Sequence, residues 1–201
     1  QAFHLKTHAN MWRMSGDFWD RSEALDSMFR LCEQWYPYVE EGCWPDCDML
    51  PLGVLQLTET DPRYRARKTR FTENEQRTVM NLWCMFRSPL MFGGELTLLD
   101  GFTLSLITNR ELLAIDQFSS GNRPVVSDPE KAVWTCRDMN GSTVYALFNL
   151  KHEPQTVALD LGETGLSYYD LWTKETAPLP GTVLAASLGP RESRVFRIIN
   201  E

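Results

Sequence analysis

The sequence lacks any long uninterrupted apolar run. No stretch of its 201 residues approaches the roughly 20 apolar residues that a membrane-spanning helix needs. We therefore expect no membrane partner, and the opening segment 1–8 also lacks the apolar core of a signal peptide. Apolar residues make up 43% and charged residues 23% of the chain. These shares are typical of globular proteins and exclude a disordered, collagen-like or coiled-coil chain.

Cysteine and histidine are scarce. The five cysteines are an odd number, so they cannot all pair within the chain, and there are only three histidines. Cys43 and Cys47 are close, but no second Cys/His pair follows them, which argues against a zinc site. The pair Gly93-Gly94 lacks the Lys-Ser/Thr of a phosphate-binding loop. We therefore expect no metal and no organic cofactor, while cysteine usage leaves the compartment open.

Positive charge is in deficit. Twenty Lys and Arg stand against 27 Asp and Glu, which gives a net charge of −7 and argues against nucleic acid as a partner. The one basic run, 61–70, holds five cations and is expected to be a solvated loop, with an aglycone or subunit contact as the alternative. The chain begins at Gln1 without an initiator Met. We expect it to be processed or to be a piece of a longer protein.

Amphipathic helical patterns alternate with short apolar runs in the first half. Predicted helices cover 20–36, 73–87 and 103–116, the last broken near 108–109, and a predicted buried strand covers 89–92. Asp20 with Glu23, and Thr72 with Glu75, have the spacing of a capping box at a helix start. Buried strands between helices predict βα units and a parallel sheet.

The second half has the two-residue period of strands. Predicted strands cover 132–136, 144–148, 156–159, 168–172 and 193–198. Asn140-Gly141 between the first two is a hairpin signal. Such spacing predicts an antiparallel β-sandwich. The small polar stretch 119–122 marks the expected boundary, which gives two predicted domains, 1–120 and 121–201.

Acids and aromatics are concentrated in two segments, 12–20 and 42–50. Aromatic rings stack on sugars and carboxylates bind hydroxyls, and glycoside hydrolysis needs two carboxyl groups. A carboxyl at Asp17, placed among aromatic residues, is expected to be partly desolvated, which would raise its pKa. The alternative is structural, because Asp20 could be a helix N-cap and the pair Asp46 and Asp48 a turn that bonds its own backbone.

Several motifs resemble those of family-27 glycoside hydrolases, the α-galactosidases and α-N-acetylgalactosaminidases. Segment 12–17 resembles their W-R-x-S-x-D, and segment 44–50 resembles their W-N-D-P-D-M-L. Segments 75–90, 106–117, 146–149 and 170–172 resemble later parts of the family in the same order. The resemblance implies the C-terminal portion of a (β/α)8 TIM barrel followed by an antiparallel β-sandwich, in the α/β plus all-β class. The barrel part would hold about its last three βα units.

The resemblance assigns roles to individual residues. Asp17 matches the acid/base carboxylate of a retaining double displacement on terminal α-linked galactose or N-acetylgalactosamine. Residues matched to substrate binding are Trp12, Arg13, Asp48 and Met49, and residues matched to structural support are Trp44 and Asp46. Cys47 replaces the usual proline of the motif and Pro45 its usual asparagine. The matching nucleophile would be an Asp in a K-x-D segment upstream of Arg13, so this chain alone is expected to be inactive.

Two other interpretations of the function remain open from the sequence alone. The chain could be a non-catalytic sugar-binding or structural module built around the β-sandwich. It could also come from an α-glycosidase that acts on another sugar, since the segment expected to select the sugar is upstream. An α-galactoside or related saccharide is the expected partner, and the oligomeric state is left open.

Overall fold

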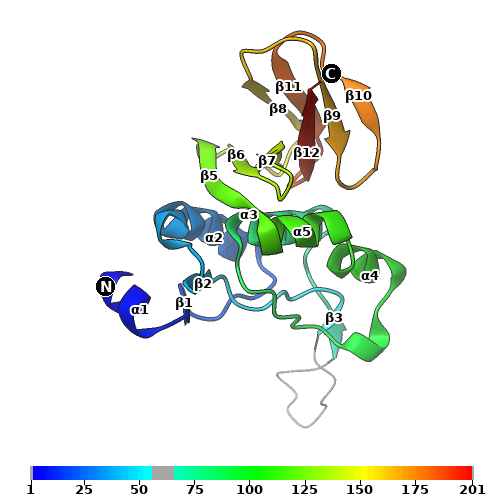
Figure 1. Cartoon of the computed structure of the whole chain (residues 1–201). Helices are drawn as coiled ribbons and strands as arrows, with labels where there is room; N and C mark the ends of the chain where they lie inside the picture. The colour runs from blue at the N-terminus through cyan, green and yellow to red at the C-terminus, as the bar shows by residue number, and fades with distance from the viewer. Residues whose placement is uncertain (1, 56–65, 201) are drawn as a thin grey trace.

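The computed structural model describes residues 2–55 and 66–200, with helices in the first half and strands in the second (Figure 1). The elements of the first half are α1 (Ala2–His8), β1 (Met11–Arg13), α2 (Ser22–Trp35), the 3-10 turn η1 (Tyr36–Tyr38), β2 (Trp44–Asp46), β3 (Val54–Leu55), β4 (Arg67–Lys68), α3 (Glu73–Phe86), the 3-10 turn η3 (Leu96–Leu98), α4 (Gly101–Ile107) and α5 (Arg110–Phe118).

A parallel strand pair organises the first half. Strands β1 and β2 pair in parallel with Arg13 opposite Asp46, and α2 connects them as a crossover helix. Parallel pairing is thereby confirmed. The predicted strand 89–92 is wrong as a full strand, because only Phe92 forms a single parallel bridge, with Leu50. The described residues do not include a closed barrel.

Helix ends follow the local sequence at two of three sites. Thr72 and Glu75 form the predicted capping box of α3, and both bonds are present. The predicted break near 108–109 is confirmed, because the Asn109 side chain accepts the amide N–H groups of Glu111 and Leu112 at the start of α5.

The predicted cap of α2 is wrong. Asp20 is 1% exposed and receives bonds from the Arg67 guanidinium and the Arg70 amide, while Arg21 occupies the N-cap without a side-chain bond. A buried carboxylate is better satisfied by a guanidinium than by a helix end. Arg67 therefore does not belong to a solvated loop, and the part of that predicted loop before residue 66 lies outside the described residues.

Two antiparallel sheets form the second half (Figure 1). Its strands are β5 (Ser120–Ser127), β6 (Lys131–Arg137), β7 (Thr143–Asn149), β8 (Gln155–Asp160), β9 (Leu166–Asp170), β10 (Thr176–Pro178), β11 (Val183–Leu188) and β12 (Ser193–Asn200). A six-stranded sheet runs β10-β9-β12-β7-β6-β5, and β11 pairs with β8 in the other sheet. The five predicted strands and the sandwich are confirmed, whereas β5, β10 and β11 were not predicted.

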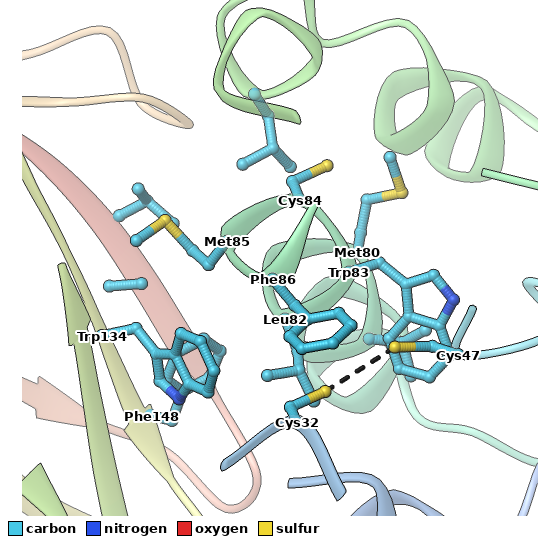
Figure 2. Packing of buried hydrophobic residues seen from close by; sticks show 14 of the residues in the cluster. Cys32, Cys47, Met80, Leu82, Trp83, Cys84, Met85, Phe86, Trp134 and Phe148 are labelled. Atoms are coloured by element: carbon cyan, nitrogen blue, oxygen red, sulfur yellow. Dashed lines mark hydrogen bonds between the residues drawn. The ribbon is translucent and has the colours of Figure 1, made fainter. Parts of the chain in front are cut away.

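The hydrophobic core is continuous between the two halves. Figure 2 shows Trp83 and Phe86 of α3 in one buried cluster with Trp134 and Phe148 of the sandwich. The Phe29 and Phe148 rings meet edge to face with centroids 5.1 Å apart. The change from helix to strand lies between α5 and β5, close to the expected boundary, and the packing across it holds the first half in a fixed position on the sandwich.

Candidate active site

The candidate site lies where β1 and β2 end. Arg13 is the last residue of β1 and Asp46 the last residue of β2, and the parallel register places them side by side. Carboxyl ends of parallel strands share one edge, where α/β enzymes place their reactive groups. The segments that follow the two strands therefore meet at this edge.

A tight turn holds Asp48 beyond β2. The Asp46 carboxylate accepts the Asp48 amide N–H at 2.8 Å, and Asp48 has a left-handed φ of 78°. Asp tolerates this conformation better than most residues when its neighbours bond locally. The indole N–H of Trp83 donates to the Asp48 carbonyl at 3.0 Å, and the Cys47 amide donates to the Ser88 hydroxyl at 3.0 Å. The alternative of a self-bonded turn is thus correct for Asp46, and that turn presents Asp48.

Arg13 connects the carboxylates of both segments. Its Nη2 lies 2.8 Å from Oδ2 of Asp48 and 3.6 Å from Oδ1 of Asp17. The same Nη2 donates to the Gly16 carbonyl at 2.7 Å, and the Phe18 amide donates to Oδ2 of Asp48 at 2.7 Å. One cation and two carboxylates are therefore gathered by bonds between segments that are about 30 positions apart in sequence.

Burial separates the three carboxylates. Asp46 is 3% exposed, and this burial raises the pKa of its carboxyl. The negative charge of Asp48 raises the pKa further, whereas the hydrogen bond from the Asp48 amide and the charge of Arg13 lower it. The Asp48 side chain is 15% exposed and the Asp17 side chain 79%. The expected desolvation of Asp17 among aromatic residues is wrong for the described chain, because Phe18 turns into the core and leaves Asp17 at the surface.

The other predicted residues surround this group to different degrees. Met49 packs against Gly93, where an added Cβ would come within 2.6 Å of the Met49 sulfur. Trp12 is buried and packs near Trp35 with ring centroids 6.0 Å apart. Neighbouring side chains of a strand point to opposite faces, so Trp12 faces away from Arg13, and this placement does not support its predicted sugar contact.

Trp44 lies at the opposite end of β2 from Asp46. Its ring lies under the Arg87 guanidinium, 4.7 Å from the guanidinium carbon to the ring centroid. Trp44 therefore contacts Arg87 at the start of β2 and does not contribute to the carboxylate group at the end of the strand.

Sequence reasoning missed three groups that position Asp48. They are the Phe18 amide and the Trp83 indole, which bond Asp48, and the Ser88 hydroxyl, which bonds the neighbouring Cys47 amide. Trp83 carried a usable signal, because a buried indole N–H usually has a hydrogen-bond acceptor. The amide and the hydroxyl carried none, since only the folded chain brings them to residues 46–48.

The group suits hydroxyl recognition better than metal binding. Within residues 2–55 and 66–200, no three His, Cys, Asp or Glu side chains are grouped as metal ligands would be. The helices of this same part of the chain are also too short or too polar to cross a bilayer. Guanidinium donors and carboxylate acceptors together can bond neighbouring hydroxyls in both directions.

Comparisons with known proteins find relatives along nearly the whole chain. Residues 128–198 match the family described as the alpha galactosidase C-terminal beta sandwich domain. An alpha-galactosidase from Oryza sativa is 25% identical over 195 residues, which cover 93% of this chain and 43% of that protein. The chain thus spans about half the length of the curated relatives it matches.

Solved structures are similar over almost the whole chain. A GH27 β-L-arabinopyranosidase from Geobacillus stearothermophilus is 44% identical with a TM-score of 0.92, over 98% of this chain and 46% of that one. A putative alpha-N-acetylgalactosaminidase from Bacillus halodurans is 38% identical with a TM-score of 0.84, over 94% of this chain and 46% of that one. The chain is therefore similar in sequence and fold to the C-terminal part of a GH27 glycosidase, and residues 128–198 match the β-sandwich domain.

Proposed function

We propose that this chain supplies the acid/base and part of the sugar-binding half of a retaining glycosidase site. The substrate class is a terminal pyranoside with the ring configuration of galactose. The observation that carries the proposal is the group of Arg13, Asp17 and Asp48 at the ends of two parallel strands. The similarity to GH27 glycosidases supports the same reaction class.

The charges of the group suit a division of roles. Asp48 is held by a guanidinium and a backbone amide, which orient its carboxylate oxygens to accept bonds from sugar hydroxyls. Within residues 2–55 and 66–200 the charged partner of Asp17 is Arg13, at 3.6 Å, and the Asp17 side chain is 79% exposed, which lets its carboxyl meet a leaving oxygen.

The proposed reaction proceeds in two displacements. An upstream carboxylate attacks the anomeric carbon while Asp17 protonates the leaving oxygen. Asp17 then removes a proton from water, and that water releases the sugar with overall retention. Retention requires the two carboxyl groups to stand about 5 Å apart, and in the proposed reaction the second carboxyl comes from a segment upstream of this chain.

Leaving-group dependence tests the role of Asp17. In the parent polypeptide, Asp17→Asn should slow hydrolysis of poor alkyl leaving groups about 100-fold or more, because they need a proton. Activated aryl glycosides should be affected far less. Glu163→Gln, at an exposed acid in the sandwich, is the matched control. Equal activity of Asp17→Asn and the parent on both substrates would refute the assignment.

A β-L-arabinopyranoside is the second candidate substrate. The arabinopyranosidase of Geobacillus is 44% identical to this chain, against 25% for the curated rice alpha-galactosidase, and a variant of it has been solved with arabinose. β-L-arabinopyranose presents the ring hydroxyls of α-D-galactopyranose without the hydroxymethyl group. The ratio of kcat/KM for the two nitrophenyl glycosides decides between them, and an enzyme that accepts neither would overturn both.

A further inference from the structure

A cavity of about 730 Å³ is lined by α3, the junction of α4 and α5, and the sandwich. Four of its lining side chains are cations: Arg77, Arg110, Lys174 and Arg194. Two are carboxylates, Glu111 and Glu192. This excess of cations is opposite to the net charge of −7 on the whole chain. The cavity shares no residue with the Arg13–Asp48 group, and its volume is within the range of about 300–1,000 Å³ for ligand pockets.

Two of the four cations already have carboxylate partners. Lys174 Nζ lies 3.0 Å from Oε1 of Glu111, and Nε of Arg194 donates to Oδ2 of Asp170 at 2.7 Å. These pairs are internal to the protein. A ligand is therefore not needed to balance either cation.

The other two cations are not balanced. Within residues 2–55 and 66–200, no carboxylate lies within ion-pair distance of Arg77 or Arg110, and neither side chain donates a hydrogen bond. The remaining lining carboxylate, Glu192, accepts the Gly189 amide at 2.7 Å. Two guanidinium groups thus stand against one carboxylate, so the cavity keeps a positive charge that an anion would balance.

Arg77 is held at the wall of the cavity by two aromatic rings. Its guanidinium carbon lies 5.5 Å from the ring centroid of Phe102 and 5.5 Å from that of Trp172. The Trp172 ring is itself fixed, because its indole N–H donates to Oδ1 of the buried Asn81 at 2.9 Å. The rings hold the cation and leave its fork of N–H donors to oxygen atoms. That fork fits two oxygens of a carboxylate or a phosphate.

We propose that the cavity of Arg77, Arg110 and Trp172 binds a small anion through a phosphate or carboxylate group. Both guanidinium groups can be reached by a ligand, because Arg77 is half-buried and Arg110 is exposed. A guanidinium already held by two rings loses less freedom on binding than a mobile one. The inference goes beyond the proposed glycosidase activity and does not depend on it.

Titration of the complete chain with inorganic phosphate, and separately with citrate, tests the proposal. Sodium chloride holds the ionic strength constant, so that general screening is the same at every point. In ¹⁵N-resolved NMR spectra, the Trp172 indole and the Arg110 amide should shift and saturate at about millimolar anion. Saturation by phosphate alone or by citrate alone supports the proposal and identifies the group that the cavity prefers.

Substitutions distinguish a site from general charge attraction. Arg77→Met keeps an apolar side chain against the two rings and should weaken binding about tenfold or more, because it removes bonds to a charged group. Arg110→Gln changes an exposed residue and should weaken binding about threefold. Arg137→Met is the matched control, since Arg137 bonds Gly141 and Thr143 and does not line the cavity. It removes the same charge and should leave the titration unchanged.

Two outcomes would overturn the proposal. One is the absence of saturable shifts in the unsubstituted chain up to about 50 mM of either anion. The other is equal weakening by Arg77→Met and Arg137→Met, which would show attraction by surface charge alone. Since the first measurement needs no substitution, it stands even if a variant fails to fold. Loss of hydrolysis in the parent polypeptide would affect neither readout.

Discussion

The buried carboxyl of Asp116 should make the chain less stable as pH rises. Burial raises its pKa to about 7, although the hydrogen bond from Gln117 and the charge of Arg87 both act to lower it. In the unfolded chain the same carboxyl titrates near 3.8. Asp116→Asn keeps the shape of the side chain and removes the charge, so it isolates this ionisation.

The sign and size follow from the two pKa values. The folded state holds the proton up to about pH 7 and the unfolded state loses it near pH 4, so the stabilisation is fully present below about pH 4 and lost as pH rises to about 7. A difference of about three pKa units corresponds to about 4 kcal/mol. The free energy of unfolding of Asp116→Asn, relative to that of the parent chain, should therefore rise by about 4 kcal/mol between about pH 4 and pH 8.

Urea unfolding of both chains at several pH values measures this difference. All other carboxylates titrate equally in the two proteins, so the gap between the two free energies of unfolding reports Asp116 alone. We expect the gap to change mainly between about pH 4 and 7 and then to level off. Parallel curves for the two chains across this range would refute the reasoning, because they would show that Asp116 ionises as easily in the folded chain as in the unfolded one.

Three further predictions concern other parts of the chain. Asp20→Asn should destabilise the chain by about 3 kcal/mol at neutral pH in urea unfolding, because it breaks a buried ion pair. Burial alone would raise the Asp20 pKa, but the bonds from Arg67 and Arg70 lower it overall. The stabilisation is therefore present above the ordinary Asp pKa and disappears as pH falls. If the difference in free energy of unfolding between the two chains were unchanged at about pH 2, the prediction would be contradicted. Gly94→Ala should prevent stable folding, because its Cβ would lie 2.2 Å from the Leu52 carbonyl oxygen, whereas Gly93→Ala meets only the flexible Met49 side chain and should weaken sugar binding without loss of helicity. Arg191→Met should lower the free energy of unfolding by about 3 kcal/mol, because it removes the buried Arg191 from its ion pair with Asp26. Unfolding should still show a single transition by both tryptophan fluorescence and circular dichroism, because the two halves share one core. Two separate transitions would contradict this.

Fold prediction succeeded where the pattern is local. The apolar periodicity of α3 and the two-residue period of β6 and β7 are set by neighbouring residues, and all three elements were predicted within one or two positions. Strand β5 was not predicted because it contains Gly121 and Pro124, which are poor strand residues. Its pairing with β6, which has two register irregularities, accommodates them.

Site prediction was limited by contacts between distant segments. The motifs identified Arg13, Asp17 and Asp48 as residues of one site, and the structure brings them together. The exposure of Asp17 could not be predicted, because local sequence does not say toward which side Phe18 turns. The burial of Asp116 could not be predicted either, since its surroundings come from segments distant in sequence, such as Trp44 and Arg87.

The sequence by itself determined the elements, the sandwich and the residue types of the sugar chemistry. These depend on periodicity, turn residues and short motifs, whose physical causes act within a few positions. Only the tertiary structure decided which groups meet and which are buried: the Trp83 indole on Asp48, the buried pairing of Asp20, and the burial of the Asp116 carboxyl. Such contacts depend on burial and on the positions of chains far apart in sequence, and the local pattern carries no record of either.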